Sequence, residues 1–179
     1  MKLTWVAAIA AISLTRGVGI GFAARPEGAG VTVITGKSDQ EAARAALAEA
    51  ERLTSKGYQE LIAIGRVYYL SGDKAKGDAL FARVIGVKKT STVYQLIADM
   101  YAEAGENAKA EENYSKMLGL ESESGSQEAD VGAWYIRTGQ RARGEEHLGR
   151  AFRLDPHEPA HYIHAAQSLL GIPAASLDC

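Results

Sequence analysis

One pattern recurs three times along this chain, at a spacing of 33 to 34 residues. Each copy carries a small residue and, three positions later, a tyrosine: Gly65 and Tyr68, Ala98 and Tyr101, Gly132 and Tyr135. Self-similarity at a fixed period of this length is the signature of repeat architectures, in which one supersecondary unit stacks on copies of itself. Because a single unit cannot bury both of its faces, we expect an elongated stack in place of one deep core.

The second half of each repeat has its own signature. A turn with a glycine follows the tyrosine, and a helix-favouring segment then carries a small residue with a large apolar residue four positions later. The turn glycines are Gly72, Gly105 and Gly139, and the pairs are Gly77 with Phe81, Ala110 with Tyr114, and Gly144 with Leu148. We expect the small residues to let the two helices approach closely, and the tyrosines and large apolar residues to fill the space between them.

The repeat resembles the tetratricopeptide pattern, in which W-x2-L-G-x2-Y is followed by A-x3-F and a proline. The first copy reads Leu61-x2-Ile64-Gly65-x2-Tyr68, and the closing proline occurs once, at Pro156. The resemblance implies an all-α fold, a right-handed superhelical solenoid of tandem helix-turn-helix units. Full units are expected at about 58–90, 91–124 and 125–158, within a repeat domain of 38–173.

Half units are expected on both sides of the three full ones. Residues 39–55 resemble a second helix, and the helix that starts near Pro159 resembles a first helix. The third unit departs from the pattern, because Glu128 stands where a large apolar residue is expected and the stretch before it is polar. We therefore expect its first helix to start late, near Ala129, and the joint at 121–128 to be the weak point of the stack.

The N-terminal residues predict a targeting segment. An apolar run, Leu3–Leu14, follows Lys2, and small residues lie around Ala23, so residues 1–23 are expected to be a cleaved signal peptide. The alternative is an uncleaved inner-membrane anchor over residues 3–24, a span that Arg16 interrupts. Export, to the periplasm or out of the cell, is the expected localisation.

Two further segments flank the repeats. Residues 24–37 are expected to form a connector, with Val31–Thr35 extended because each of its residues is β-branched. Residues 174–179 are expected to form a tail. The tail ends in the single cysteine of the sequence, Cys179, so no internal disulfide can form.

The sequence offers little that would support catalysis. Its formal net charge of −2 provides no basic field, so no nucleic-acid partner is expected. The stretch 157–161 reads H-E-x-x-H, a zinc-peptidase motif that needs both histidines on one helix. Pro159 lies inside it and suits the first turn of a helix better than the middle. A metal-dependent hydrolase is therefore the minor alternative, and we expect no enzyme activity, no cofactor and no metal.

The resemblance also implies where a partner would bind, because the first helices of tetratricopeptide proteins line a concave face that holds peptides. The inward-facing positions carried over to this sequence are Ile62, Arg66, Tyr69, Gln95, Asp99, Ala102, Ala133, Ile136 and Arg137. The lysine and asparagine clamp of one subfamily is absent from the corresponding positions. The expected function is a scaffold for a protein or peptide partner. Similarity to exported bacterial repeat proteins implies a place in envelope, secretion or pilus assembly, with membrane contact only through an uncleaved N-terminal segment.

Overall fold

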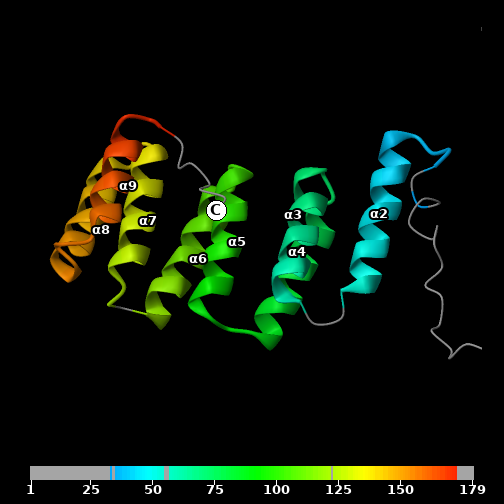
Figure 1. The fold of residues 1–179 in the computed structure, drawn as a ribbon, viewed down its shortest axis with the longest axis horizontal. Helices are drawn as coiled ribbons and strands as arrows, with labels where there is room; N and C mark the ends of the chain where they lie inside the picture. Colours follow the sequence, from blue (N-terminus) through cyan, green and yellow to red (C-terminus); the bar gives the residue numbers. More distant parts are fainter. Residues whose placement is uncertain (1–32, 34, 55–56, 122, 173–179) are drawn as a thin grey trace, which may run out of the picture.

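The computed structural model describes residues 33, 35–54, 57–121 and 123–172. Over these residues the chain forms eight α-helices and no strand, and the helices stand in a row from α2 at one end to α8 and α9 at the other (Figure 1). The helices are α2 (Asp39–Leu53), α3 (Tyr58–Leu70), α4 (Lys74–Val87), α5 (Ser91–Glu103), α6 (Asn107–Leu120), α7 (Gly125–Arg137), α8 (Arg141–Leu154) and α9 (Pro159–Leu169).

Consecutive helices pair into hairpins. The closest packing is between α3 and α4, between α5 and α6, and between α7 and α8. At the ends of the row, α2 packs on α3, and α9 packs mainly on α7. The all-α fold of tandem hairpins, with three full units and a half unit on each side, is therefore confirmed.

The turn glycines end the first helices. Gly72, Gly105 and Gly139 have φ angles of 101°, 73° and 83°, a left-handed conformation that a residue with a Cβ adopts only with strain. The amide that follows each glycine donates back to the carbonyl oxygen of the repeat tyrosine. For Asp73 and Tyr68 this distance is 2.9 Å. The arrangement satisfies carbonyl groups at the helix end that would otherwise lack a partner.

The small residues of the pattern mark the closest approach within a hairpin. A Cβ on Gly65 would lie 2.6 Å from the Phe81 ring, and a Cβ on Gly144 would lie 2.7 Å from the Gly132 carbonyl oxygen. A larger residue at Gly65 would displace the Phe81 ring, and one at Gly144 would meet the backbone of the partner helix. The large residues of the pattern are buried as predicted: Tyr68, Phe81, Tyr101, Tyr114, Tyr135 and Leu148.

Ion pairs at the surface connect each second helix to the next one. They join Glu51 to Lys76 (3.3 Å), Asp78 to Lys109 (2.7 Å) and Glu111 to Arg143 (2.6 Å). In the last two pairs the acid directly follows, and the base directly precedes, the small residue of its own repeat. Partly exposed pairs of this kind contribute less than about 1 kcal/mol each. Their regular placement nevertheless forms a charged ladder along the second helices.

The third unit differs from its prediction. Helix α7 begins at Gly125 and not near Ala129, because the Ser124 side chain accepts a hydrogen bond from the Gln127 amide and caps the helix. Glu128 is 7% exposed, so it occupies the buried position although it is charged. Its carboxylate lies 2.6 Å from His147 Nδ1 and 3.1 Å from Arg150 Nε, both on α8. These partners replace the apolar contact that the pattern leads one to expect.

Several predicted segments lie outside the described residues: the signal peptide or anchor at 1–23, most of the connector, and the tail with Cys179. Of the segment expected to be extended, Val33 is helical and Thr35 lies in a turn, so these two positions differ from the prediction. Lys37 Nζ donates to the Val33 carbonyl oxygen (2.7 Å), and Gly36 has a φ of 75° that suits the turn. None of the helices in the described part is long and apolar enough to span a bilayer.

Candidate functional site

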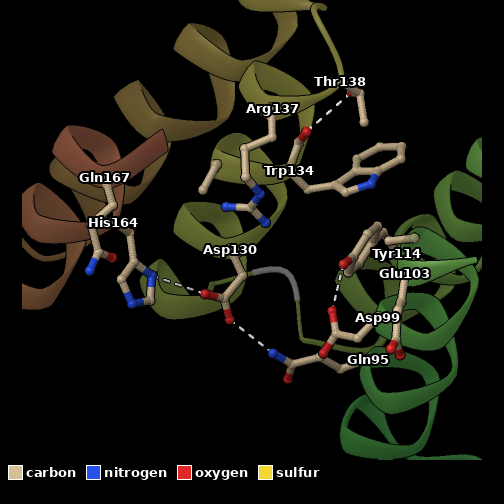
Figure 2. A pocket seen from close by; sticks show the side chains of 12 residues that line it. Gln95, Asp99, Glu103, Tyr114, Asp130, Trp134, Arg137, Thr138, His164 and Gln167 are labelled. Carbon is tan, nitrogen blue, oxygen red and sulfur yellow. Dashed lines mark hydrogen bonds and ion pairs between the residues drawn. The ribbon is translucent and has the colours of Figure 1, made fainter. Parts of the chain in front are cut away.

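A cavity of about 570 Å³ opens between α5, α7 and α9, which are the first helices of units two and three and of the last half unit (Figure 2). Tyr114 of α6 completes its wall. Side chains from four helices, far apart in the sequence, therefore meet around one space.

Two carboxylates are prominent in this cavity. Asp99 accepts a hydrogen bond from the Tyr114 hydroxyl (2.5 Å), and Asp130 accepts one from Gln95 Nε2 (2.8 Å) and lies 3.0 Å from His164 Nδ1 (Figure 2). Asp99 can still be reached from the open side, but the surrounding helices remove much of its hydration. This desolvation raises the pKa of Asp99, and the charge of Asp130 raises it further. Burial likewise raises the pKa of Asp130, against the opposing effects of His164 and Gln95.

Arg137 is the cation of this cavity. Its side chain extends from α7 into the space beside Asp130 and Trp134, and it forms no ion pair with any described residue (Figure 2). Its charge acts on both carboxylates at longer range and lowers the pKa of each. The guanidinium therefore keeps donors free for a ligand.

Aromatic side chains form another part of the wall. The ring centroids of Tyr114 and Trp134 lie 5.1 Å apart, and Trp134 is 3% exposed. The indole Nε1 is buried and has no hydrogen-bond partner in the described part of the chain. A buried donor without a partner costs free energy. A ligand acceptor that formed a hydrogen bond with this N–H would therefore stabilise the complex.

A second cavity, of about 350 Å³, lies between α3 and α5. Its lining is more apolar and includes Ile62, Leu96 and Met100. Arg66 lies at its edge and pairs with Glu103, with 2.5 Å between Nε and the carboxylate. Asp99 and Glu103 line both cavities, so the two form one groove across the first helices. From here on, the groove means these two cavities together.

Seven of the nine residues predicted for the binding face line the groove. Gln95, Asp99, Ala102, Ala133 and Arg137 border the larger cavity, and Ile62 and Arg66 border the smaller one. Ile62 and Ala133 are themselves largely buried, so they contribute only small patches of surface.

The other two predicted residues lie elsewhere. Tyr69 is 2% exposed and packs edge-on against the Tyr101 ring at 5.4 Å, so the prediction that it faces a ligand is wrong. It lies between units one and two, where the next hairpin covers it. Ile136 points toward α8, since a Cβ on Gly144 would lie 2.5 Å from its Cγ1.

Other residues of the groove were missed by the sequence reasoning. Trp134 and Asp130 are on α7, next to predicted positions, and His164 is on the last half unit. Tyr114 was assigned only a packing role. Its hydroxyl reaches the groove because α6 lies behind the gap between α5 and α7, an arrangement that the pattern of one repeat does not reveal.

The histidines near the C-terminus do not form a zinc-peptidase site. His157 lies in the turn before α9, and Glu158 caps that helix by accepting a hydrogen bond from the Ala160 amide (3.0 Å). His161 is 2% exposed and packs against Gly125, whereas His164 faces Asp130. The two histidines of the motif are therefore not on one helical face. Among the described residues no group of three or more potential ligands could hold a metal ion.

No family model and no curated protein matches this chain. Among solved structures the chain is similar to the crystal structure of MamA, with 14% sequence identity and a TM-score of 0.49. The similarity covers 74% of this chain and 77% of that chain. At this identity and TM-score the likeness carries no information about function. The helices themselves establish the fold, a row of tandem helical hairpins with a half unit on either side.

Proposed function

We propose that this chain is a non-enzymatic scaffold that binds an extended segment of a protein partner in the groove. The observation that carries the proposal is the groove itself, which crosses α3, α5, α7 and α9 without a described segment to fill it. A segment that follows it would meet apolar side chains at α3 and charged ones at α7. Such a mixture of apolar and polar contacts is typical of surfaces that recognise peptides.

A variant that fills the groove tests the proposal. Ala102 is a small residue of α5 in the wall of the larger cavity, so Ala102→Trp places a large ring there. Ala82 is an exposed alanine of α4, a second helix, and Ala82→Trp adds the same ring away from the groove. The tagged full chain is captured from its host with wild type and both variants, after matched melting curves show that all three are folded.

We expect proteins captured by the wild type to be lost with Ala102→Trp and retained with Ala82→Trp. Chemical cross-links from a captured protein should also map to α5 and α7. Capture of the same proteins, in the same amounts, by all three chains would show that the groove is not where partners bind.

We also propose that the protein is exported, with a signal peptide cleaved after Ala23 or Ala24 and a role in envelope, secretion or pilus assembly. The support is the apolar run after Lys2 with small residues near Ala23. Intact-mass measurement of the protein from its host should give a chain that begins at Ala24 or Arg25. A mass that includes Met1 to Ala23, in protein recovered from membranes, would favour the anchor.

A further inference from the structure

We propose that the larger cavity of the groove selects a basic side chain, lysine or arginine, of the bound segment. The inference rests on the proposed function, because it assigns the ligand chemistry of the same groove. The cation would lie between Asp99 and Asp130, and the backbone of the segment would lie along Trp134 and Arg137.

The two carboxylates have unused capacity for a cation. Asp99 accepts one hydrogen bond within the described chain, from Tyr114, so its second oxygen stays open to the cavity. Asp130 is fixed in position by Gln95 and His164, one on each oxygen. An ionised carboxylate offers about four lone-pair sites, so both residues can accept further donors. Neither carboxylate is paired with a lysine or arginine of the described chain.

Carboxylates outnumber lysine and arginine side chains around the cavity. Glu103 is paired with Arg66, which leaves Asp99 and Asp130 with the guanidinium of Arg137 and the imidazole of His164. Partial desolvation by the surrounding helices and repulsion from Asp130 raise the pKa of Asp99, and partial desolvation raises the pKa of Asp130. A cation placed between them would relieve both effects, because an opposite charge nearby favours the ionised carboxylate.

Trp134 gives independent support for a ligand. Its indole N–H is buried and unpartnered, and Figure 2 shows the nitrogen edge of the ring turned toward Tyr114, at the cavity wall. This donor has no acceptor in the described chain, and the exposed guanidinium of Arg137 beside it has donors free for one. A peptide supplies carbonyl oxygens together with a basic side chain, whereas a free polyamine or metal ion supplies no acceptor. The volume of about 570 Å³ lies within the range of about 300–1,000 Å³ usual for ligand pockets.

Peptide pools test this selectivity directly. The probes are fluorescein-labelled short peptides of random sequence with one fixed central residue: lysine, arginine, glutamine or glutamate. Fluorescence anisotropy is measured against the purified full chain, the double variant Asp99→Asn with Asp130→Asn, and the control Glu123→Gln. Asparagine keeps the size of the side chain and an acceptor for Tyr114 or Gln95. Glu123 is an exposed acid outside the groove.

We expect the lysine and arginine pools to bind at least about tenfold more tightly than the glutamate pool, since like charges in a desolvated site are strongly disfavoured. The preference should disappear in the double variant and persist in Glu123→Gln. Equal binding of all pools, no binding by any pool, a preference for glutamate, or an unchanged preference in the double variant would overturn the inference. If Ala102→Trp abolishes partner capture but the pools show no basic preference, the scaffold proposal stands and this one fails.

Discussion

Tyr101 lies at the boundary between units one and two and contacts three residues of unit one there. Its ring meets the rings of Tyr69 (5.4 Å) and Phe81 (5.7 Å) edge-on, which is a favourable aromatic geometry. Its hydroxyl donates to Asp78 (2.6 Å), which also pairs with Lys109. These three partners belong to unit one, so the Tyr101 side chain helps to join the two hairpins.

Truncating the Tyr101 side chain should strongly destabilise the fold. Tyr101→Ala is expected to lower the free energy of unfolding by about 3–5 kcal/mol, as for other buried aromatic residues, against a total of about 5–15 kcal/mol for a domain. Tyr101→Phe keeps the ring and removes one hydrogen bond, so it should cost about 1 kcal/mol. Urea unfolding of both variants measures the difference. Equal midpoints for the two would show that the ring contributes little.

At the residue scale, the repeat pattern predicted burial within a hairpin more accurately than burial between neighbouring hairpins. Phe81 follows directly from the repeat, because its spacing fixes the face of α4 that meets Gly65 of α3. The repeat tyrosine Tyr101 was expected between the helices of its own hairpin, but it packs on unit one. Tyr69 was misassigned because its burial depends on the neighbouring unit. The position equivalent to Tyr69 in the next unit is Ala102, which is small enough to leave the groove open there.

At the scale of helices, the α7–α8 hairpin solves the packing problem in a different way from α3–α4. Glu128 and His147 occupy the positions that Leu61 and Leu80 hold in the first hairpin, counted from Gly132 and Gly144 as from Gly65 and Gly77. The sequence showed the polar residue but not its partner, because the pairing depends on the rotation of α8 against α7. The sequence therefore led to the prediction of a late helix start, whereas the structure has a buried contact between the Glu128 carboxyl group and the His147 imidazole.

The contact between Glu128 and His147 can be tested by placing leucine at both positions, as in the first hairpin. Glu128→Leu alone should lower the free energy of unfolding by about 1–2 kcal/mol, because His147 and the partly exposed Arg150 lose their acceptor. The double change Glu128→Leu with His147→Leu should recover this loss or exceed wild type, since apolar residues often replace buried ion pairs without cost. Thermal unfolding of the wild type, both single variants and the double variant gives the four stabilities that a double-mutant cycle compares. A double variant less stable than either single one would contradict this account.

At the scale of the whole molecule, each hairpin contacts its neighbours in the row, and the half units cover the outer faces. This order along the row was predictable, because the repeat period fixes it. The groove was predictable only in part. The pattern identified its helices and seven of its residues, but the contributions of Tyr114 from α6 and His164 from α9 arise from how successive units are turned relative to one another.

The charged ladder along the second helices has a mechanical consequence. Charged contacts link α2, α4, α6 and α8 in sequence. Side-chain contacts also join the first helices, from Arg66 to Glu103, from Gln95 to Asp130 and from Asp130 to His164. Bending that spreads the first helices apart strains the contacts across the groove, while bending in the opposite sense strains the charged ladder. Admitting a wider segment should therefore require one of the contacts across the groove to break first.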